Sequence, residues 1–189
     1  WQLALHHCQQ SDITVIAGFA AGKTSGLAMS AITWSAMTPH FSFYDVAPTA
    51  NQAYQMFTYL RDRLVEGMPF FDKFIEGGKK EGAKIVERPY PKIVIVYGLP
   101  QKSGKPRKVK SELIFLSADK NASKIKNIEA DWICLDQAEE IVNLDDTVRN
   151  LGTRTRGNRP DGTKRLGRLT LLANSNDNVF SDNNFIGNS

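Results

Sequence analysis

The stretch from residue 17 to residue 24 constrains the fold of this chain more than any other. It reads AGFAAGKT, follows the apolar residues 13–16 and precedes a run whose apolar residues have helical spacing. A strand, a small-residue loop and a helix are the setting in which the pattern G-x-x-x-x-G-K-[ST] binds phosphate through backbone N–H groups at a helix N-terminus. The sequence therefore predicts a buried parallel strand followed by a phosphate-binding loop.

The chemistry of this loop assigns a role to each residue type. Lys23 is predicted to reach the outer phosphates, and the hydroxyl of Thr24 to join the shell of a Mg²⁺ ion. Ala17 stands where the first glycine is usual, and its methyl group is tolerated if the residue keeps a negative φ. The alternative is an ordinary glycine-containing turn with a surface lysine. The predicted phosphate-binding residues are Gly18, Phe19, Ala20, Ala21, Gly22, Lys23, Thr24 and Ser25.

Composition indicates a globular chain without a membrane anchor. The 189 residues are 41% hydrophobic and 23% charged, which suits one domain, or a domain with a modest insertion. No apolar run approaches the roughly 20 residues that a membrane span needs, and the first residues lack the pattern of a signal peptide. Cys8 and Cys134 are far apart and form no disulfide framework, so we expect a cytoplasmic protein.

Positive charge is concentrated in two stretches, although the net charge is only +4. Residues 102–110 carry five positive charges, and a second basic stretch spans residues 154–168. Such segments can contact nucleic-acid phosphates, but runs of charge are also commonly solvated loops. The residues predicted to contact nucleic acid are Lys105, Arg107, Lys108 and Lys110.

Strand-like and helix-like segments alternate along the chain, which predicts an α/β fold with a mostly parallel sheet covered by helices on both faces. We expect one domain over residues 1–189, with an inserted β-rich hairpin segment at about 83–117. The tail from residue 174 is expected to loop off the sheet. Expected strands are 13–16, 41–46, 84–87, 92–97, 112–117, 132–135 and 168–173, and expected helices are 2–10, 25–32, 50–65, 123–128 and one after Gln137.

Two strand ends carry side chains that suit a nucleotide site. Asp136 follows the apolar residues 132–135, and a carboxylate at the carboxyl edge of a parallel sheet can hold the Mg²⁺ shell. Asn174 and Ser175 follow residues 171–173 and could sense the outer phosphate or its attacking water. Both patterns also occur in ordinary turns after strands.

In order and spacing, these segments resemble the ATPase domain of the tailed-bacteriophage terminase large subunit, the motor that pumps viral DNA into a capsid. The matching segments are residues 1–2, the loop, and residues 46–53, 114–119, 125–128, 133–140 and 173–176. The resemblance implies a P-loop NTPase of the additional-strand type that hydrolyses ATP with Mg²⁺. It also implies that Gln2 contacts adenine, and that Asn174 and Ser175 couple nucleotide state to the grip on DNA.

Further expectations about partners and location follow from the same resemblance. It implies double-stranded DNA, the portal and the small terminase subunit as partners, and a homo-oligomeric ring as the active form. The expected location is the host cytoplasm and, transiently, the capsid portal. The family's nuclease domain is expected to be absent, because the ATPase sheet takes up the 189 residues.

Two positions depart from the family pattern. Phe19 stands where an arginine is frequent, so the arginine that stabilises the transferring phosphoryl group is expected to be Arg154, Arg156 or Arg159, from this chain or a neighbouring subunit. Gln137 stands where a water-activating acid is usual, and an amide cannot accept a proton. Glu139 or Glu140 therefore serves as the base, or Gln137 is an engineered replacement that traps ATP.

Two other functions remain open from the sequence. A helicase-like or recombinase-like DNA-dependent ATPase shares both nucleotide motifs. A nucleotide-binding assembly module with little turnover is favoured by the amide of Gln137.

Overall fold

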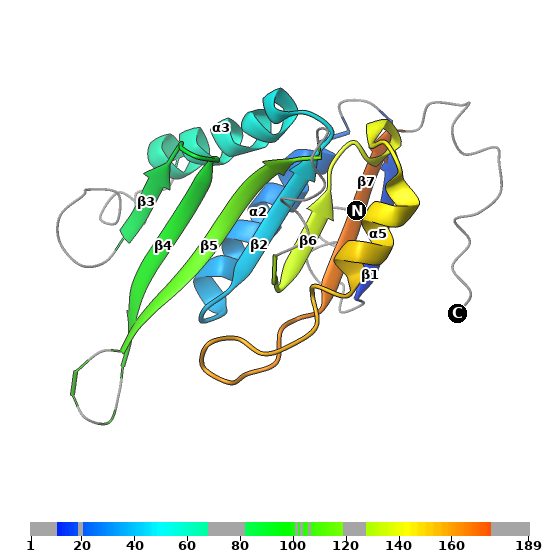
Figure 1. Cartoon of the computed structure of the whole chain (residues 1–189). Helices are drawn as coiled ribbons and strands as arrows, with labels where there is room; N and C mark the ends of the chain where they lie inside the picture. The colour runs from blue at the N-terminus through cyan, green and yellow to red at the C-terminus, as the bar shows by residue number, and fades with distance from the viewer. Residues whose placement is uncertain are drawn as a thin grey trace.

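The computed structural model describes residues 11–18, 21–67, 82–100, 102, 104, 105, 107–118 and 128–174. These residues form a seven-stranded sheet in the order β1-β7-β6-β2-β5-β4-β3, flanked by helices (Figure 1). The strands are β1 (Asp12–Ala17), β2 (Ser42–Ala47), β3 (Gly82–Val86), β4 (Lys92–Leu99), β5 (Arg107–Ser117), β6 (Trp132–Leu135) and β7 (Arg168–Asn174). The helices are α2 (Lys23–Met37), α3 (Ala50–Gly67), α5 (Leu144–Gly152) and the 3₁₀ turn η2 (Ala138–Glu140).

The five strands from β1 to β5 in the sheet order run parallel, while β4 and β3 continue the sheet antiparallel. The strand β7 lies between β1, which leads into the phosphate loop, and β6, which ends before Asp136. This is the additional strand that the resemblance in sequence implied. The predicted α/β fold with a mostly parallel sheet is confirmed, and the carboxyl ends of five strands share one edge.

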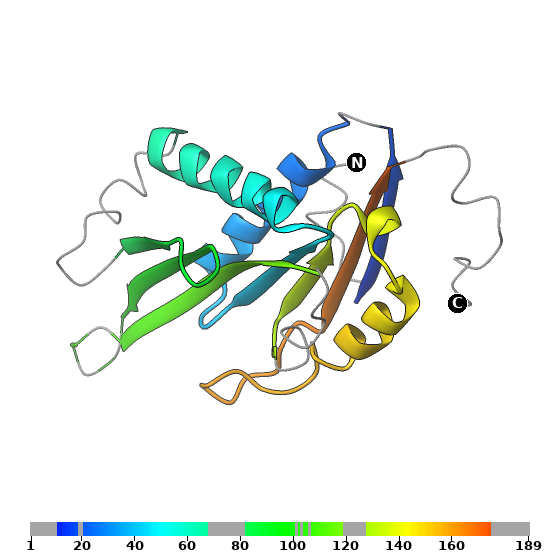
Figure 2. The ribbon, with the colours of Figure 1, turned by 45° about the horizontal axis from the view of Figure 1, so that its top comes forward.

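Helices cover both faces of the sheet (Figure 2). On one face, α2 and α3 enclose a core whose largest fully buried side chains include Phe43, Phe57 and Trp132. On the other face, Ile133 and Leu135 of β6 pack with residues of α5, such as Leu151. The alternation of β6 residues between the two cores follows from the two-residue period of a strand and explains why all four are buried.

The helix α3 begins with a capping box. Thr49 and Gln52 are three residues apart, and the Thr49 backbone N–H and hydroxyl both donate to Gln52 Oε1, at 2.9 and 2.7 Å. The Gln52 backbone N–H donates in turn to Thr49 Oγ1 at 3.3 Å. This reciprocal arrangement satisfies N–H groups that the first turn of a helix leaves unpaired.

The strand β5 begins earlier than the sequence predicted. We expected it at residue 112, but it begins at Arg107, so Arg107, Lys108 and Lys110 lie in a strand rather than in a loop. The physical reason is alternation, because the buried Val109 and Ser111 alternate with the exposed Lys108 and Lys110, and the ladder with β4 continues to Arg107. The second half of β5 pairs with β2, so this strand joins the antiparallel extension to the parallel sheet.

One further expectation needed correction. The strand β1 was predicted to be buried, but in the described structure it pairs with β7 alone and forms an edge, where Ile16 is 46% exposed. The helix expected after Gln137 is confirmed, as the 3₁₀ turn η2 followed by α5 from Leu144. The expected helix at 2–10, nearly all of that at 123–128 and the tail after Asn174 lie outside the described residues. No helix in the described part is long and apolar enough to span a bilayer.

Candidate nucleotide site

A cavity of about 310 Å³ opens at the carboxyl edge of the sheet, where β1, β6 and β7 end. Its volume is at the lower end of the range for small-molecule sites. Ligands of open α/β sheets bind in this position, outside the carboxyl ends of the strands. The cavity is lined by Ala21, Gly22, Lys23, Thr24, Ser25, Asp136, Gln137, Leu172, Ala173 and Asn174.

The phosphate loop brings the N-terminus of α2 to this cavity. Gly22 has φ 75° and ψ 26°, a left-handed conformation that glycine adopts without steric cost. It is the N-cap of α2 and provides no side chain to cap the helix. Backbone N–H groups at such an end, together with the helix dipole, favour an anion. Ala17 ends β1 and is not among the described residues with positive φ, so its methyl group is accommodated as predicted.

Lys23 is the first residue of α2 and is buried. Its Nζ donates to the carbonyl oxygens of Ala17 and Gly18, at 2.8 and 2.9 Å, and to Asn174 Oδ1 at 2.9 Å. All three acceptors are neutral, and the described residues give Lys23 no carboxylate partner. The ammonium charge is therefore available to an anion that enters the cavity.

Thr24 and Asp136 lie side by side at the cavity wall. The Thr24 hydroxyl donates to Asp136 Oδ2 at 3.2 Å, and the Gln137 backbone N–H donates to Oδ1 at 3.0 Å. Burial raises the pKa of Asp136, and these two hydrogen bonds act against that rise. A carboxylate and a hydroxyl beside a phosphate site are oxygen ligands of the kind that Mg²⁺ uses with substrate phosphates, so these residues fit the ion.

Asn174 connects the lysine to an acid. Its backbone N–H and its Nδ2 both donate to Glu139 Oε1, at 3.1 and 2.5 Å, while its Oδ1 accepts from Lys23. The other carboxylate oxygen of Glu139 is buried and has no hydrogen-bond partner among the described residues. The carboxyl end of β7 and the phosphate loop therefore belong to the same site.

Gln137 lines the cavity, whereas neither Glu139 nor Glu140 does. Its backbone is left-handed, with φ 53°, at the turn between β6 and η2. Its Oε1 accepts from Gln52 Nε2, and the same nitrogen donates to Glu140 Oε2 at 2.8 Å. Sequence reasoning did not single out Gln52. The pattern Thr-x-x-Gln after an apolar strand was the signal that could have drawn attention to it.

The three candidate arginines are not brought to this cavity. The Arg154 carbonyl accepts from the Ala130 backbone N–H at 3.1 Å, and Arg159 Nη2 forms an ion pair with the buried Asp131 at 2.7 Å. Residues 153–167, which include Arg156, form a loop at the end of the sheet opposite the strand tips (Figure 1). These arginines are separated from Asp136 of the same chain by the length of β6.

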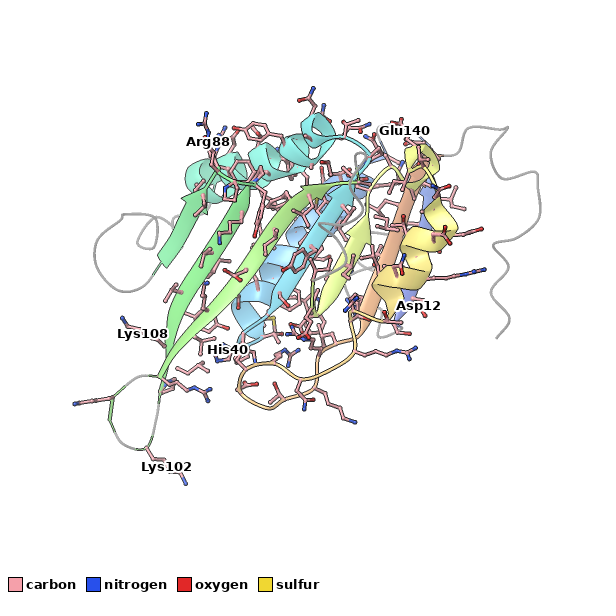
Figure 3. The ribbon with its side chains drawn as sticks, viewed as in Figure 1. Asp12, His40, Arg88, Lys102, Lys108 and Glu140 are labelled. Carbon is pink, nitrogen blue, oxygen red and sulfur yellow. The ribbon has the colours of Figure 1, made fainter. Side chains whose placement is uncertain are left out.

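The basic residues of the β4–β5 hairpin are also at the opposite end from the cavity. Lys102 and Lys108 lie near the tip of this hairpin, whereas Glu140 lies at the carboxyl edge of the sheet (Figure 3). Lys110 forms an ion pair with Glu112 at 2.6 Å. The predicted site residues Gln2, Phe19, Ala20 and Ser175 lie outside the described residues.

Comparison with known proteins finds matches in structure but none in sequence. No family sequence model matches the chain, and no curated protein matches it in sequence. The ATPase domain of the large terminase of Thermus phage P74-26 has a TM-score of 0.61 and 19% identity over 91% of this chain and 62% of that one. A large terminase from a thermophilic bacteriophage has a TM-score of 0.59 and 16% identity over 91% of this chain and 38% of that one.

The same bacteriophage's large terminase in complex with ADP has a TM-score of 0.56 and 16% identity, over 92% of this chain and 37% of that one. The chain thus spans less than two thirds of each of these structures. Since the identities are low, the likeness concerns the fold. The chain has the fold of phage large-terminase ATPase domains, as the resemblance in its sequence indicated.

Proposed function

We propose that this chain is the ATP-hydrolysing motor domain of a viral DNA-packaging terminase, which couples ATP turnover to movement of double-stranded DNA into a capsid. The observation that carries the proposal is the convergence of Lys23, Thr24, Asp136 and Asn174 on one cavity at the carboxyl edge of a terminase-like sheet. These side chains come from three segments far apart in sequence, and each has the chemistry that a nucleoside triphosphate site needs.

Nucleotide binding follows from the polar groups that line the cavity. The loop N–H groups and the Lys23 ammonium hold the phosphates, because phosphate oxygens replace the neutral carbonyls that now accept from Lys23. Thr24 and Asp136 hold the Mg²⁺ ion, which neutralises charge on the outer phosphates when it is bound. Gln2 contacts adenine.

Water activation requires a base other than Gln137, because its amide cannot accept a proton. Glu139 and Glu140 follow in the same turn, and each is held by a hydrogen bond to a neighbouring amide. One of them takes the proton of the attacking water, while the Gln137 amide positions that water. Asn174, and Ser175 after it, transmit the occupancy of the phosphate site, since Asn174 contacts Lys23 and Glu139 together.

The opposite ends of the sheet have separate roles in the motor. Lys105, Arg107, Lys108 and Lys110 bind the DNA backbone, with Lys110 contributing less because Glu112 already pairs with it. Arg154 or Arg156 completes the nucleotide site of the next subunit in a homo-oligomeric ring. The portal and the small terminase subunit are the protein partners, in the host cytoplasm and at the capsid portal.

The test is phosphate release by the purified chain with ATP, measured with and without linear duplex DNA and with Mg²⁺ removed by a chelator. We expect Mg²⁺-dependent turnover that duplex DNA increases. Absence of turnover in both the wild type and the Gln137→Glu variant would contradict the motor function.

A second candidate is a nucleotide-binding assembly module with little turnover. The position of Gln137 in the cavity wall favours it, because an amide stands where the water-activating carboxylate is expected. Tight binding of Mg²⁺ and ATP without phosphate release would select this function.

A further inference from the structure

The side chain of Gln52 in α3 donates to Gln137 in the turn after β6, 85 residues away in sequence. The strands β2 and β6 are neighbours in the sheet, so the helix that follows β2 begins next to the turn that follows β6. The direction of the Gln52 amide is settled by its contacts. The Thr49 backbone N–H can only donate, so the atom it contacts at 2.9 Å is Oε1 of Gln52.

The other end of the same amide is therefore a donor that faces the site. Its Nε2 contacts Gln137 Oε1 and also Glu140 Oε2, at 2.8 Å for the latter. Both N–H groups of the Gln52 side-chain amide therefore donate to residues of the turn after β6. Gln52 itself is in the first turn of a helix whose residues Met56, Phe57 and Leu60 are buried in the core, so its backbone has a fixed position.

This contact determines what Gln137 offers to the cavity. Its Oε1 is engaged by Gln52 from the side of α3, so the amide nitrogen is the polar group that remains for the cavity that Gln137 lines. A donor in this place suits a phosphate oxygen or the lone pair of an attacking water. Without Gln52, the Gln137 amide could turn over and present its oxygen instead.

We propose that Gln52 is a positioning residue of the nucleotide site, which holds the Gln137 amide with its nitrogen toward the terminal phosphate and fixes the Glu140 carboxylate beside it. The inference rests on the proposed function, because it concerns the same cavity and its turnover. It adds a residue of α3 to a site otherwise built by the phosphate loop, β6 and β7.

The variant Gln52→Glu separates positioning from stability. Glutamate at this position keeps the capping box, because its carboxylate still accepts from the Thr49 N–H, but it removes both N–H donors. We expect Tm to be retained, KM for ATP to stay near the wild-type value, and kcat to fall roughly 10- to 100-fold, the scale of a misplaced reacting group. Gln55→Glu is the matched control, since Gln55 is an exposed glutamine of the same helix.

Gln52→Ala is the second variant, which removes the donors without adding charge. We expect the same loss of kcat with KM unchanged, and a lower Tm because the capping box is lost. Both variants and the control are measured in the wild-type background, because Gln137→Glu would remove the amide whose orientation is tested.

Wild-type kcat in Gln52→Glu and Gln52→Ala, while the parent protein turns over ATP, would overturn the inference and leave the proposed function intact. A loss of kcat in Gln52→Ala alone, tracking its lower Tm, would show a structural role and also overturn it. No turnover in the wild type would overturn the inference, and no turnover in Gln137→Glu as well would contradict the proposed function.

Discussion

At the scale of single residues, the proposed chemistry depends on Gln137, which stands where the resemblance in sequence implies an acid. If Glu139 or Glu140 is the natural base, the wild type hydrolyses ATP, and replacing that glutamate by glutamine lowers kcat by roughly 10²–10⁴, the usual worth of a positioned base. Gln137→Glu then gives no large gain in kcat, because a base is already present. We expect this outcome, because both glutamates lie in the turn that Gln137 begins and are held by neighbouring amides.

Phosphate release by Gln137→Glu, Glu139→Gln and Glu140→Gln decides between the two readings of this position. A gain of roughly 10²–10⁴ in Gln137→Glu alone would show that a carboxylate belongs at residue 137 and would contradict our expectation.

A second residue-scale feature is the carboxyl group of Asp45, which is fully buried with neither oxygen hydrogen-bonded among the described residues. Burial, and then the charge of Asp136, raise the pKa of Asp45 well above its usual value. The folded chain therefore keeps this proton at a pH where the unfolded chain, with a pKa of about 4, has lost it.

This difference gives the pH dependence of stability a definite sign. Between the unfolded and folded pKa values, unfolding releases the proton of Asp45, so its contribution makes the free energy of unfolding fall as pH rises, by about 1.4 kcal/mol per pH unit. We expect Asp45→Asn to flatten this fall in urea unfolding measured from pH 5 to pH 8. An identical slope in the wild type and the variant would show that Asp45 is ionised in the folded chain.

At the scale of elements, the β4–β5 hairpin places its basic residues at the end of the sheet opposite the candidate nucleotide cavity. Replacing Lys105, Arg107 and Lys108 together by alanine should weaken duplex DNA binding and reduce the salt slope by up to about 0.9 per lost phosphate contact. Fluorescence anisotropy of a labelled duplex over a salt series measures both effects.

Lys110→Ala is the matched control for the hairpin, because Lys110 is paired with Glu112 and has less charge to offer DNA. We expect a smaller change in affinity and slope for this variant. An unchanged salt slope in the triple variant would mean that the hairpin is solvated or faces a protein.

At the scale of the whole molecule, the sequence predicted what depends on local patterns. The phosphate loop and Asp136 were recognised because apolar runs end at them, and the parallel sheet brings those ends to one edge. The alternation of strands and helices was likewise sufficient for the fold class.

Features that depend on strand order were not predictable in this way. The contact of Gln52 with Gln137 requires β2 and β6 to be neighbours, which no local pattern specifies. Arg154 and Arg156 lie at the far end of the sheet because the chain returns to that end after α5, where β7 begins. The edge position of β1 could not be seen either, because apolar residues occur in edge and central strands alike.

The central claim is that this cavity binds and hydrolyses ATP through Lys23, and its most direct test compares ATP turnover by Lys23→Ala and the wild type. Lys164→Ala is the control, because Lys164 is an exposed lysine in the loop at the far end of the sheet. We predict that Lys23→Ala loses phosphate release, since the charge contact with the outer phosphates is removed, while Lys164→Ala keeps wild-type turnover. Phosphate release by Lys23→Ala at the wild-type rate, with ATP bound as tightly as by the wild type, would contradict the assignment of the nucleotide site.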